Sequence, residues 1–441
     1  MAGPSTTGLA SVQVMRARGL LLAISALLAL SACTPEGGAD RGIDSGSRTP
    51  TRSVRGSSSP APVAARLVAP PGGSYLIRGR FPHVESRCVR PEQPALLARY
   101  PGTLRVGRAG DGTLSVTVTL PFERYLEGIA EVPPSWPAAA LEAQAVAARS
   151  YALATTGWSG EEGEPLDSPI CATASCQVYR GIPVPPDPTH RRWVRAVRRT
   201  SGEVLLFDGR PATTVYFSTS NGHTYGNEDV FGSAPLPYLR PVAERDDGAS
   251  STSHWTVRLP FRDLSRFLAA AKLWPGTRTI RSLRVRGDAL LAGARNARHD
   301  IDLDELRDAV NTWAPCLEPG RYPGHLPLTV PSRWLEPSVS GDALVLSGRG
   351  WGHGVGMVQW GAYGKARRGL SAEQILAYYY GGLVPEPYPE PGTIHVVVAS
   401  GLTRVTAIPS GPGARVRGRE LEGDRVVVVP TDGGVRVSTR G

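Results

Sequence analysis

The segment FERYLEGIAEVPPSWPAAALEAQAVAARSYALAT, residues 122–155, decides how the centre of this chain folds. Apolar side chains in its first part have the spacing of one face of a short helix. They are Tyr125, Leu126, Ile129 and Val132. The pair Pro133-Pro134 lacks amide hydrogens and must end that helix. Glu131 is therefore expected in the last turn of the helix.

A second helix is predicted after the prolines, running to about Ala154. Ser135 or Trp136 can cap it, and Pro137 suits its first turn because the fixed φ of proline matches helix geometry. Seven alanines lie between residues 138 and 148. Their small side chains allow this helix to pack closely against a neighbour.

Glu131 is a candidate general acid. A carboxyl group at the C-terminus of a helix faces the negative end of the helix dipole, which raises its pKa toward the range useful near neutral pH. Glu127 and Glu123 precede it by one and two turns, and spacing alone does not choose among the three. The plain alternative is that Glu131 is an ordinary surface acid.

Two further segments carry distinctive motifs: TVYFSTSNGHTYGNEDVFG at 214–232 and GRGWGHGVGMVQWGAYGKA at 348–366. Together with the segment around Glu131, they resemble the motifs of the SpoIID/LytB family, across roughly residues 100–384. The resemblance implies a lytic transglycosylase that cleaves the MurNAc–GlcNAc bond of peptidoglycan glycan strands. It also implies that Glu131 is the single catalytic acid/base.

The resemblance and the local patterns together predict an α+β fold. Residues 67–384 are expected to form a SpoIID-like core of mixed strands and short helices. Short alternating segments between 75 and 120 read as strands, with a hairpin turn at 110–112. Residues 255–346 have the pattern of a smaller inserted α/β subdomain, and 385–441 that of a small β-rich appendage after a proline-rich linker.

The motifs suggest which side chains line a glycan cleft. They are Arg149, Ser218, Ser220, His223, His353 and Gln359. The run of hydroxyl and amide groups from Ser218 suits carbohydrate hydroxyls, although a solvated loop has the same composition. The glycines at 348–356 let backbone approach a ligand or a neighbouring segment closely. A phosphate-binding loop is the rival reading, but no Walker lysine is present.

The N-terminus has the features of an export signal. Arg16 and Arg18 precede an apolar run that is too short to span a bilayer comfortably and ends in LSAC. This ending looks like a lipobox, so residues 1–33 are predicted to be a lipoprotein signal with lipid attached at Cys33. A plain signal peptide is the alternative. Residues 34–66 lack large apolar side chains and are expected to be a disordered tether.

The remaining cysteines form an even set in an oxidising compartment. Cys171 and Cys176 are close enough to bridge locally, which leaves Cys88 to pair with Cys316. Some members of the family bind zinc at this position with two Cys and nearby His. Ser175 stands where that pattern has a His, so we favour the disulfide over a zinc site and expect no cofactor.

The formal net charge is +10, and removing the two signal arginines leaves +8. A basic surface outside the membrane favours anionic wall polymers or lipid headgroups over nucleic acid. We therefore expect an extracytoplasmic, lipid-anchored protein that faces the cell wall, with peptidoglycan as its partner. The family name adds a link to sporulation and an amidase as a candidate partner. The rival functions are a non-catalytic amidase enhancer and a tethered glycan-binding module.

Overall fold

The computed structural model describes residues 64–80, 98–166, 168–183, 187–276, 278–295, 297–322 and 328–440. The expected lipidation site Cys33 and the expected disulfide partner Cys88 lie outside these ranges. Most of the expected tether does too. Its last residues, however, are folded, because strand β1 begins at Ala64.

A seven-stranded sheet has the order β21-β20-β1-β4-β5-β18-β6. Its strands are β1 (Ala64–Val68), β4 (Thr103–Arg108), β5 (Leu114–Pro121), β6 (Ile170–Cys171), β18 (Thr393–Leu402), β20 (Arg415–Val416) and β21 (Arg419–Glu420). The predicted hairpin joins β4 to β5, and its turn closes with a bond of 3.0 Å from the Gly112 amide to the Ala109 carbonyl. Gly112 has a φ of 81°, which explains why glycine occupies the turn.

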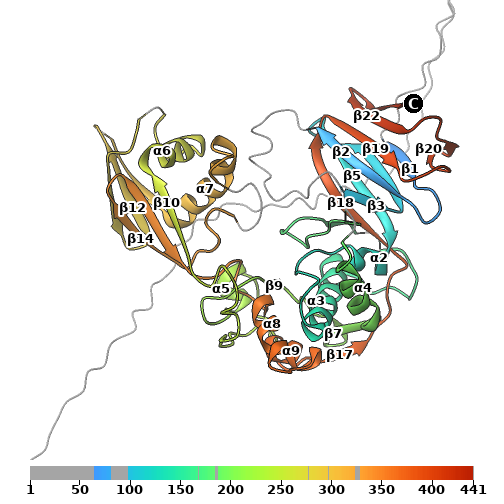
Figure 1. Ribbon diagram of the computed structural model, residues 1–441, viewed down its shortest axis with the longest axis horizontal. Helices are drawn as coiled ribbons and strands as arrows, with labels where there is room; N and C mark the ends of the chain where they lie inside the picture. The colour runs from blue at the N-terminus through green and yellow to red at the C-terminus, as the bar shows by residue number, and fades with distance from the viewer. Residues whose placement is uncertain are drawn as a thin grey trace, which may run out of the picture. The chain divides into compact units, whose positions relative to one another are not determined.

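A five-stranded sheet has the order β23-β22-β19-β2-β3. Its strands are β2 (Ser74–Arg80), β3 (Ala98–Pro101), β19 (Arg404–Pro409), β22 (Arg425–Thr431) and β23 (Gly434–Arg440). The sheet therefore combines strands from the two ends of the described chain, which lie side by side in Figure 1.

The C-terminal residues are β-rich as predicted, but they are not an appendage. Strand β18 pairs along β5 from Thr393 to Leu402, and β19 pairs with β2. The alternating valines of 393–402 give β18 a buried face that needs a partner sheet, and the N-terminal strands provide it. The expected division at residue 385 therefore does not separate two folding units.

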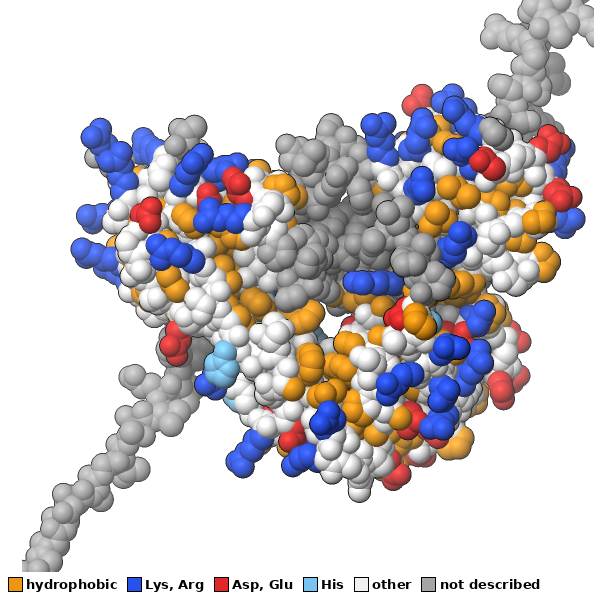
Figure 2. All heavy atoms as spheres, in the orientation of Figure 1, with side chains coloured by type: hydrophobic (Ala, Val, Ile, Leu, Met, Phe, Trp, Pro, Cys, Tyr) orange, Lys and Arg blue, Asp and Glu red, His pale blue; other side chains and the backbone are white. Residues whose placement is uncertain are grey.

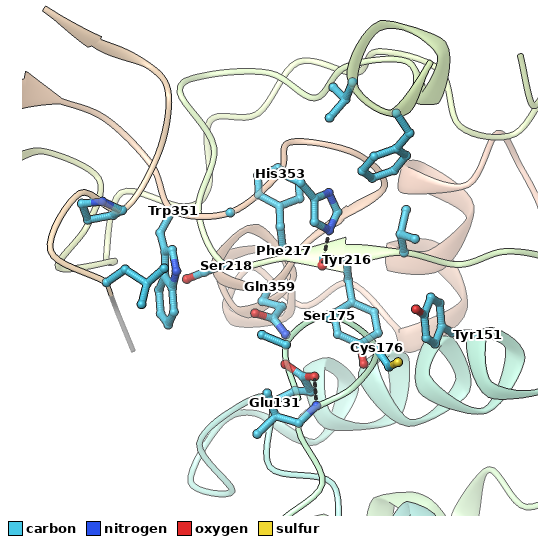
Figure 3. A pocket seen from close by; sticks show the side chains of 18 of the residues that line it. Glu131, Tyr151, Ser175, Cys176, Tyr216, Phe217, Ser218, Trp351, His353 and Gln359 are labelled. Carbon is cyan, nitrogen blue, oxygen red and sulfur yellow. Dashed lines mark hydrogen bonds between the residues drawn. The ribbon is translucent and has the colours of Figure 1, made fainter. Parts of the chain in front are cut away.

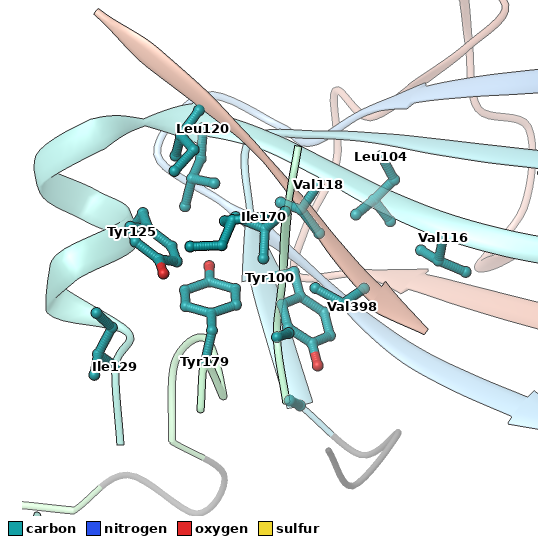
Figure 4. Packing of buried hydrophobic residues seen from close by; sticks show 14 of the residues in the cluster. Tyr100, Leu104, Val116, Val118, Leu120, Tyr125, Ile129, Ile170, Tyr179 and Val398 are labelled. Atoms are coloured by element: carbon teal, nitrogen blue, oxygen red, sulfur yellow. The ribbon is translucent and has the colours of Figure 1, made fainter. Parts of the chain in front are cut away.

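The two sheets share one hydrophobic core with helix α2 (Phe122–Glu127). Figure 4 shows part of this cluster, in which the Tyr179 ring lies between Tyr125 of α2 and Tyr100 of β3. The centroid of the Tyr179 ring is 5.2 Å from that of Tyr125 and 5.9 Å from that of Tyr100. This packing anchors the segment around Tyr179 to the sheets.

Helix α3 (Ala138–Thr156) is buried on nearly every side. Ala140, Leu141 and Ala145 belong to the core of the sheets, whereas Ala143 and Val146 belong to a second cluster with the C-terminal helices. The expected close packing is confirmed, and it explains the alanines: larger side chains would hold the neighbouring elements apart. Pro137 is the residue that caps the helix, without a side-chain hydrogen bond.

Shorter elements surround α3. They are α4 (His190–Arg199), β7 (Glu203–Phe207), β8 (Arg210–Pro211), α8 (Gln359–Arg367), α9 (Ala372–Tyr379) and β17 (Pro385–Pro387). The chain turns from β7 to β8 at Asp208-Gly209, with φ of 50° and 70°. Ser371 caps α9 and forms a capping box with Gln374. None of the helices in the described ranges is long and apolar enough to cross a membrane.

The inserted subdomain has its own core, as predicted. It contains β10 (Trp255–Pro260), α6 (Phe261–Ala270), β11 (Ser282–Arg286), β12 (Ala289–Ala294), β13 (Ala297–Asp302), α7 (Leu303–Leu317), β14 (Leu335–Ser340) and β15 (Ala343–Gly348). Asp302 caps α7 by accepting hydrogen bonds from the amides of Asp304 and Glu305.

Candidate active site

Glu131 lies in a bend after α2, not in a helix. The helix ends at Gly128, where a Cβ atom would lie 2.4 Å from the ring of Tyr179. Beyond it, the Ala130 amide donates a hydrogen bond of 2.8 Å to the Val178 carbonyl. The predicted position in a last helical turn is therefore wrong. Pairing with the segment at 178–180 replaces the helix before the two prolines are reached.

The Glu131 carboxyl is held by this same segment. The Val178 amide donates a hydrogen bond of 2.6 Å to Glu131 Oε1. Burial raises the pKa of the carboxyl above its ordinary value, and the Val178 amide, the side chains of Gln359 and Tyr216, and the charge of Arg180 oppose that rise. The direction agrees with the sequence-based expectation, but the cause is loss of water rather than a helix dipole.

The other two carboxylates of the segment are neutralised elsewhere. Glu127 forms ion pairs with Arg124 and Arg198. Glu123 accepts a hydrogen bond of 2.8 Å from Arg149. Spacing left three candidate acids. Of these three, Glu131 is the one whose carboxyl group faces a pocket.

The pocket beside Glu131 has a volume of about 700 Å³. Glu131 is the only carboxylate among the described residues that line it. Aromatic side chains form much of the wall, and Figure 3 shows Trp351, Phe217, Tyr216 and Tyr151 around the space above Glu131. Size and lining are those of a small-molecule or saccharide site.

The second and third motifs meet at this pocket. Strand β9 (Tyr216–Phe217) pairs in parallel with β16 (Met357–Val358), and isolated bridges join Thr219 to Trp351. The glycines permit this contact, as predicted: a Cβ at Gly356 would lie 2.1 Å from the Val215 carbonyl oxygen. Gly356 also has a φ of 75°, which other residues rarely adopt.

His353 lines the pocket, but its ring nitrogens are engaged by backbone. Nδ1 accepts a hydrogen bond of 3.2 Å from the Val355 amide, so Nε2 carries the proton and donates to the Tyr216 carbonyl at 2.9 Å. Burial lowers the pKa of His353 to about 4, which keeps the ring neutral. His353 therefore lines the pocket as predicted, but in this arrangement its ring nitrogens hold strand β9.

Gln359 and Ser218 are brought to the pocket as predicted. Gln359 is the first residue of α8, and its amide group donates a bond of 3.3 Å to Gln144 of α3. Ser218 follows β9 directly, and its hydroxyl lies 3.1 Å from that of Thr219. Both side chains are nearly buried and point toward the same space as Glu131 (Figure 3).

Arg149, Ser220 and His223 do not line the pocket. Arg149 is fully buried in α3 and forms ion pairs with Glu123 and Glu390, so its role is structural. The Ser220 hydroxyl donates a hydrogen bond of 2.7 Å to Asp247. His223 is exposed beside the ring of Tyr225.

Cys171 and Cys176 form a disulfide, as expected. It closes a small loop whose residues Ala174, Ser175 and Cys176 form part of the pocket wall. Cysteine binds zinc as a thiolate, and sulfurs bonded to each other offer no thiolate. The pair in this state therefore does not fit a zinc site. Cys316 lies in the last turn of α7, and its expected pairing with Cys88 stays a prediction because Cys88 is outside the described residues.

Several pocket residues were missed from the sequence. They include Tyr151 of α3, Tyr216 of β9 and Phe231 at the end of a short helix, α5 (Asn227–Phe231), none of which was among the predicted site residues. Phe231 retains 48% of its exposure although it is a large apolar side chain, which is unusual for core packing. The position of Phe231 within the second motif, next to the run of hydroxyl residues, was the available signal.

Basic side chains are frequent on the surface. Figure 2 shows them gathered over the inserted subdomain, where Arg262, Arg284 and Arg286 are exposed. Arg180, Arg307 and Arg333 line the pocket itself. The positive charge predicted from composition is therefore present both on the exposed surface and near Glu131.

The comparisons with known proteins agree with these motifs. The family model described as "Stage II sporulation protein" (SpoIID) matches residues 110–207. An uncharacterized protein of Brachyspira hyodysenteriae is 32% identical over 275 residues, which cover 62% of this chain and 68% of that protein.

Two relatives from Bacillus subtilis have descriptive names. Its "Stage II sporulation protein D" is 27% identical over 280 residues, covering 60% of this chain and 74% of the relative. Its "Amidase enhancer" is 26% identical over 296 residues, covering 58% of this chain but 39% of the relative. By the shared motifs, the matched region and these similarities, the chain belongs to the SpoIID family.

Proposed function

We propose that this protein is a lytic transglycosylase that cleaves the MurNAc–GlcNAc bond of peptidoglycan, with Glu131 as its acid and base. The observation that carries the proposal is that one carboxyl group, that of Glu131, is present among the described residues of a saccharide-sized pocket. Hydrolytic glycosidases generally use two carboxyl groups about 5–10 Å apart. One carboxyl group suits a reaction in which the nucleophile belongs to the substrate.

The reaction needs two proton transfers, and Glu131 takes part in both. Protonated Glu131 gives its proton to the glycosidic oxygen as the bond from that oxygen to the anomeric carbon breaks. The C6 hydroxyl of the same sugar then attacks the anomeric carbon, and the Glu131 carboxylate takes the hydroxyl proton. The products are a 1,6-anhydro sugar end and a free hydroxyl end, and Glu131 is regenerated. A raised pKa favours the protonated form that the first step needs.

The pocket wall suits a glycan. Phe231 and Trp351 present aromatic surface that can contact the apolar face of a sugar ring. Ser218 and Gln359 supply a hydroxyl and an amide group within the same space. Arg180 and Arg333 add positive charge at the wall, which favours substrates that carry carboxylates.

This function implies a location outside the cytoplasm. In the proposal, lipid attached to Cys33 anchors the chain to the membrane, and the following residues carry the folded part toward the wall. Cell-wall remodelling, with a link to sporulation, is the biological setting that the names of the relatives support.

The test is digestion of purified glycan strands, followed by mass spectrometry for anhydro-muropeptides. The wild-type chain should release them, and Glu131→Gln should lower the rate by about 10²–10⁴-fold. Glu127→Gln is the matched control, because Glu127 lies in the same segment but is paired with Arg124 and Arg198. It should retain activity. Absence of anhydro products with the wild-type chain would overturn the proposal.

A non-catalytic amidase enhancer is the second candidate, favoured by the similarity to a relative of that name. It predicts that the chain releases no anhydro sugars but speeds peptide release by a purified peptidoglycan amidase. It also predicts that Glu131→Gln leaves that stimulation intact. A tethered glycan-binding module would bind glycan strands and do neither.

A further inference from the structure

Tyr216 is held more rigidly than its place in a two-residue strand suggests. Its backbone pairs with Met357, and its carbonyl accepts the Nε2–H bond of His353 at 2.9 Å. The carbonyl of the preceding residue, Val215, accepts a hydrogen bond of 3.0 Å from the Tyr380 hydroxyl. The third motif and Tyr380 together therefore fix the Cα–Cβ direction of Tyr216.

The hydroxyl group of the Tyr216 side chain is unusual. The Tyr216 oxygen is buried and has no hydrogen-bond partner at full geometry within the described part of the chain. Buried hydroxyls without partners are rare in folded proteins and often mark functional sites. Figure 3 shows the Tyr216 ring reaching from β9 toward Glu131.

We propose that the Tyr216 hydroxyl is a positioning group for Glu131, donating a hydrogen bond to the carboxylate oxygen that loses its proton. This inference rests on the proposed function and assigns a residue to it. Glu131 Oε1 already accepts the Val178 amide bond, so Oε2 is the oxygen that carries and releases the proton. After release, the carboxylate is stabilised by the donors that face it, and the Gln359 side chain is one of them. The Tyr216 hydroxyl supplies another without a change of backbone.

Other groups also face Glu131 and must be separated from Tyr216 in a test. Tyr125 comes from α2 and donates its hydroxyl hydrogen to Gln177, and Tyr151 comes from α3 and bonds Thr155. Arg180 contributes positive charge from the segment after the disulfide. Of these tyrosines, Tyr125 has its hydroxyl hydrogen committed to Gln177, whereas the Tyr216 hydroxyl is one of the groups that oppose the rise in the Glu131 pKa.

The first test reads Glu131 directly and needs no activity. The full chain is labelled with ¹³C at glutamate carboxyl groups, and the Glu131 signal is identified by its loss in Glu131→Gln. Tyr216→Phe should raise the Glu131 pKa, because it removes a donor that favours the charged form. Tyr75→Phe is the matched control, since it removes a tyrosine hydroxyl that donates to the Val68 carbonyl and does not line the pocket. An unchanged Glu131 pKa in Tyr216→Phe overturns the inference.

The second test measures cleavage of glycan strands against pH. Tyr216→Phe should lower kcat by about 10- to 100-fold, the loss expected for one hydrogen bond to a charged group. It should also move the alkaline limb of the profile to higher pH, because the acid that must be protonated now has a higher pKa. A purely structural role would lower the active fraction and leave the limb in place, which would contradict the inference.

A third measurement keeps the inference testable if Tyr216→Phe does not fold. The wild-type chain is labelled with 3-fluorotyrosine, and its ¹⁹F signals are followed against pH. One signal should respond to the ionisation of Glu131 and lose that response in Glu131→Gln. Tyr125 and Tyr151 can each give a signal that loses its response in Glu131→Gln. If no third signal does so, the inference fails. If the wild-type chain releases no anhydro sugar while the ¹⁹F coupling is present, the proposed function fails and the contact stands.

Discussion

The Val178 amide donates a hydrogen bond of 2.6 Å to Glu131 Oε1, so the candidate catalytic group is oriented by backbone two residues after a disulfide. The segment between the disulfide and Val178 is short, and both of its ends are held in place. The Cys171–Cys176 bridge closes the loop, and the next residue, Gln177, is bonded to Tyr125 and to the Ala148 carbonyl.

Removal of the disulfide should therefore affect Glu131 as well as stability. Cys171→Ala/Cys176→Ala is expected to lower the free energy of unfolding by about 2 kcal/mol, the value for a loop this short. It should also lower cleavage of glycan strands in the folded fraction, because the Val178 amide becomes less well placed. Thermal unfolding and initial rates measure the two effects. A variant that is less stable yet fully active per folded molecule would show that the bridge does not position Glu131.

The buried ion-pair cluster around Arg149 gives a contrasting prediction. Arg149 is fully buried and contacts Glu123 and Glu390 but not the pocket. Arg149→Met leaves two partly buried carboxylates without their cation, and it should destabilise the fold by about 3 kcal/mol. Activity per folded molecule should stay close to that of the wild type. If Arg149→Met lowers kcat and leaves the free energy of unfolding unchanged, Arg149 has a role in the binding site.

What the sequence could predict followed from local rules. Proline and glycine positions located the turns, and apolar periodicity located α3, α6, α7 and most strands. The position of Glu131 was missed because the end of α2 is set by a contact with Tyr179, some fifty residues later. The C-terminal strands were taken for an appendage because pairing of β18 with β5 joins residues nearly 300 positions apart. Such pairings leave no local pattern.

The same reason explains why some predicted site residues are bonded to protein groups and not left open to the pocket. Arg149, Ser220 and His353 have side chains that suit substrate contact by type. Each is instead bonded to protein groups distant in sequence: Glu390, Asp247 and the Tyr216 carbonyl. Residue type indicated the chemistry available, but only the tertiary contacts show which groups remain open to the pocket.

Phe231 should contribute to glycan affinity and little to stability. Its side chain keeps 48% of its exposure and lines the pocket beside the ring of His353, at a centroid distance of 5.3 Å. Phe231→Ala is expected to weaken binding of glycan strands by roughly tenfold, the typical loss for one aromatic contact. Binding is measured by calorimetry in the Glu131→Gln background, where the strands are not cleaved. Phe231→Trp is the control and should preserve affinity. Equal affinity of the Ala and Trp variants would exclude a stacking role.

His353 predicts how stability depends on pH. Burial lowers its pKa to about 4 in the folded chain, against an ordinary value of 6.5. The unfolded chain therefore takes up a proton at a pH where the folded chain does not. The contribution of His353 to stability is complete above pH 6.5, declines as the pH falls, and is lost below about pH 4. A difference of this size corresponds to roughly 3 kcal/mol.

The check is denaturant unfolding at a series of pH values between 7 and 4, comparing the wild type with His353→Gln. Glutamine does not titrate, so the stability advantage of the wild type should shrink across this interval by up to roughly 3 kcal/mol. Carboxyl groups titrate in both proteins, and their contributions cancel in the difference. His223→Gln serves as the control because His223 is exposed, and its curve should run parallel to that of the wild type. If the curve of His353→Gln is parallel too, the imidazole is not held in its neutral form, and its Nε2–H bond to Tyr216 cannot be what fixes β9.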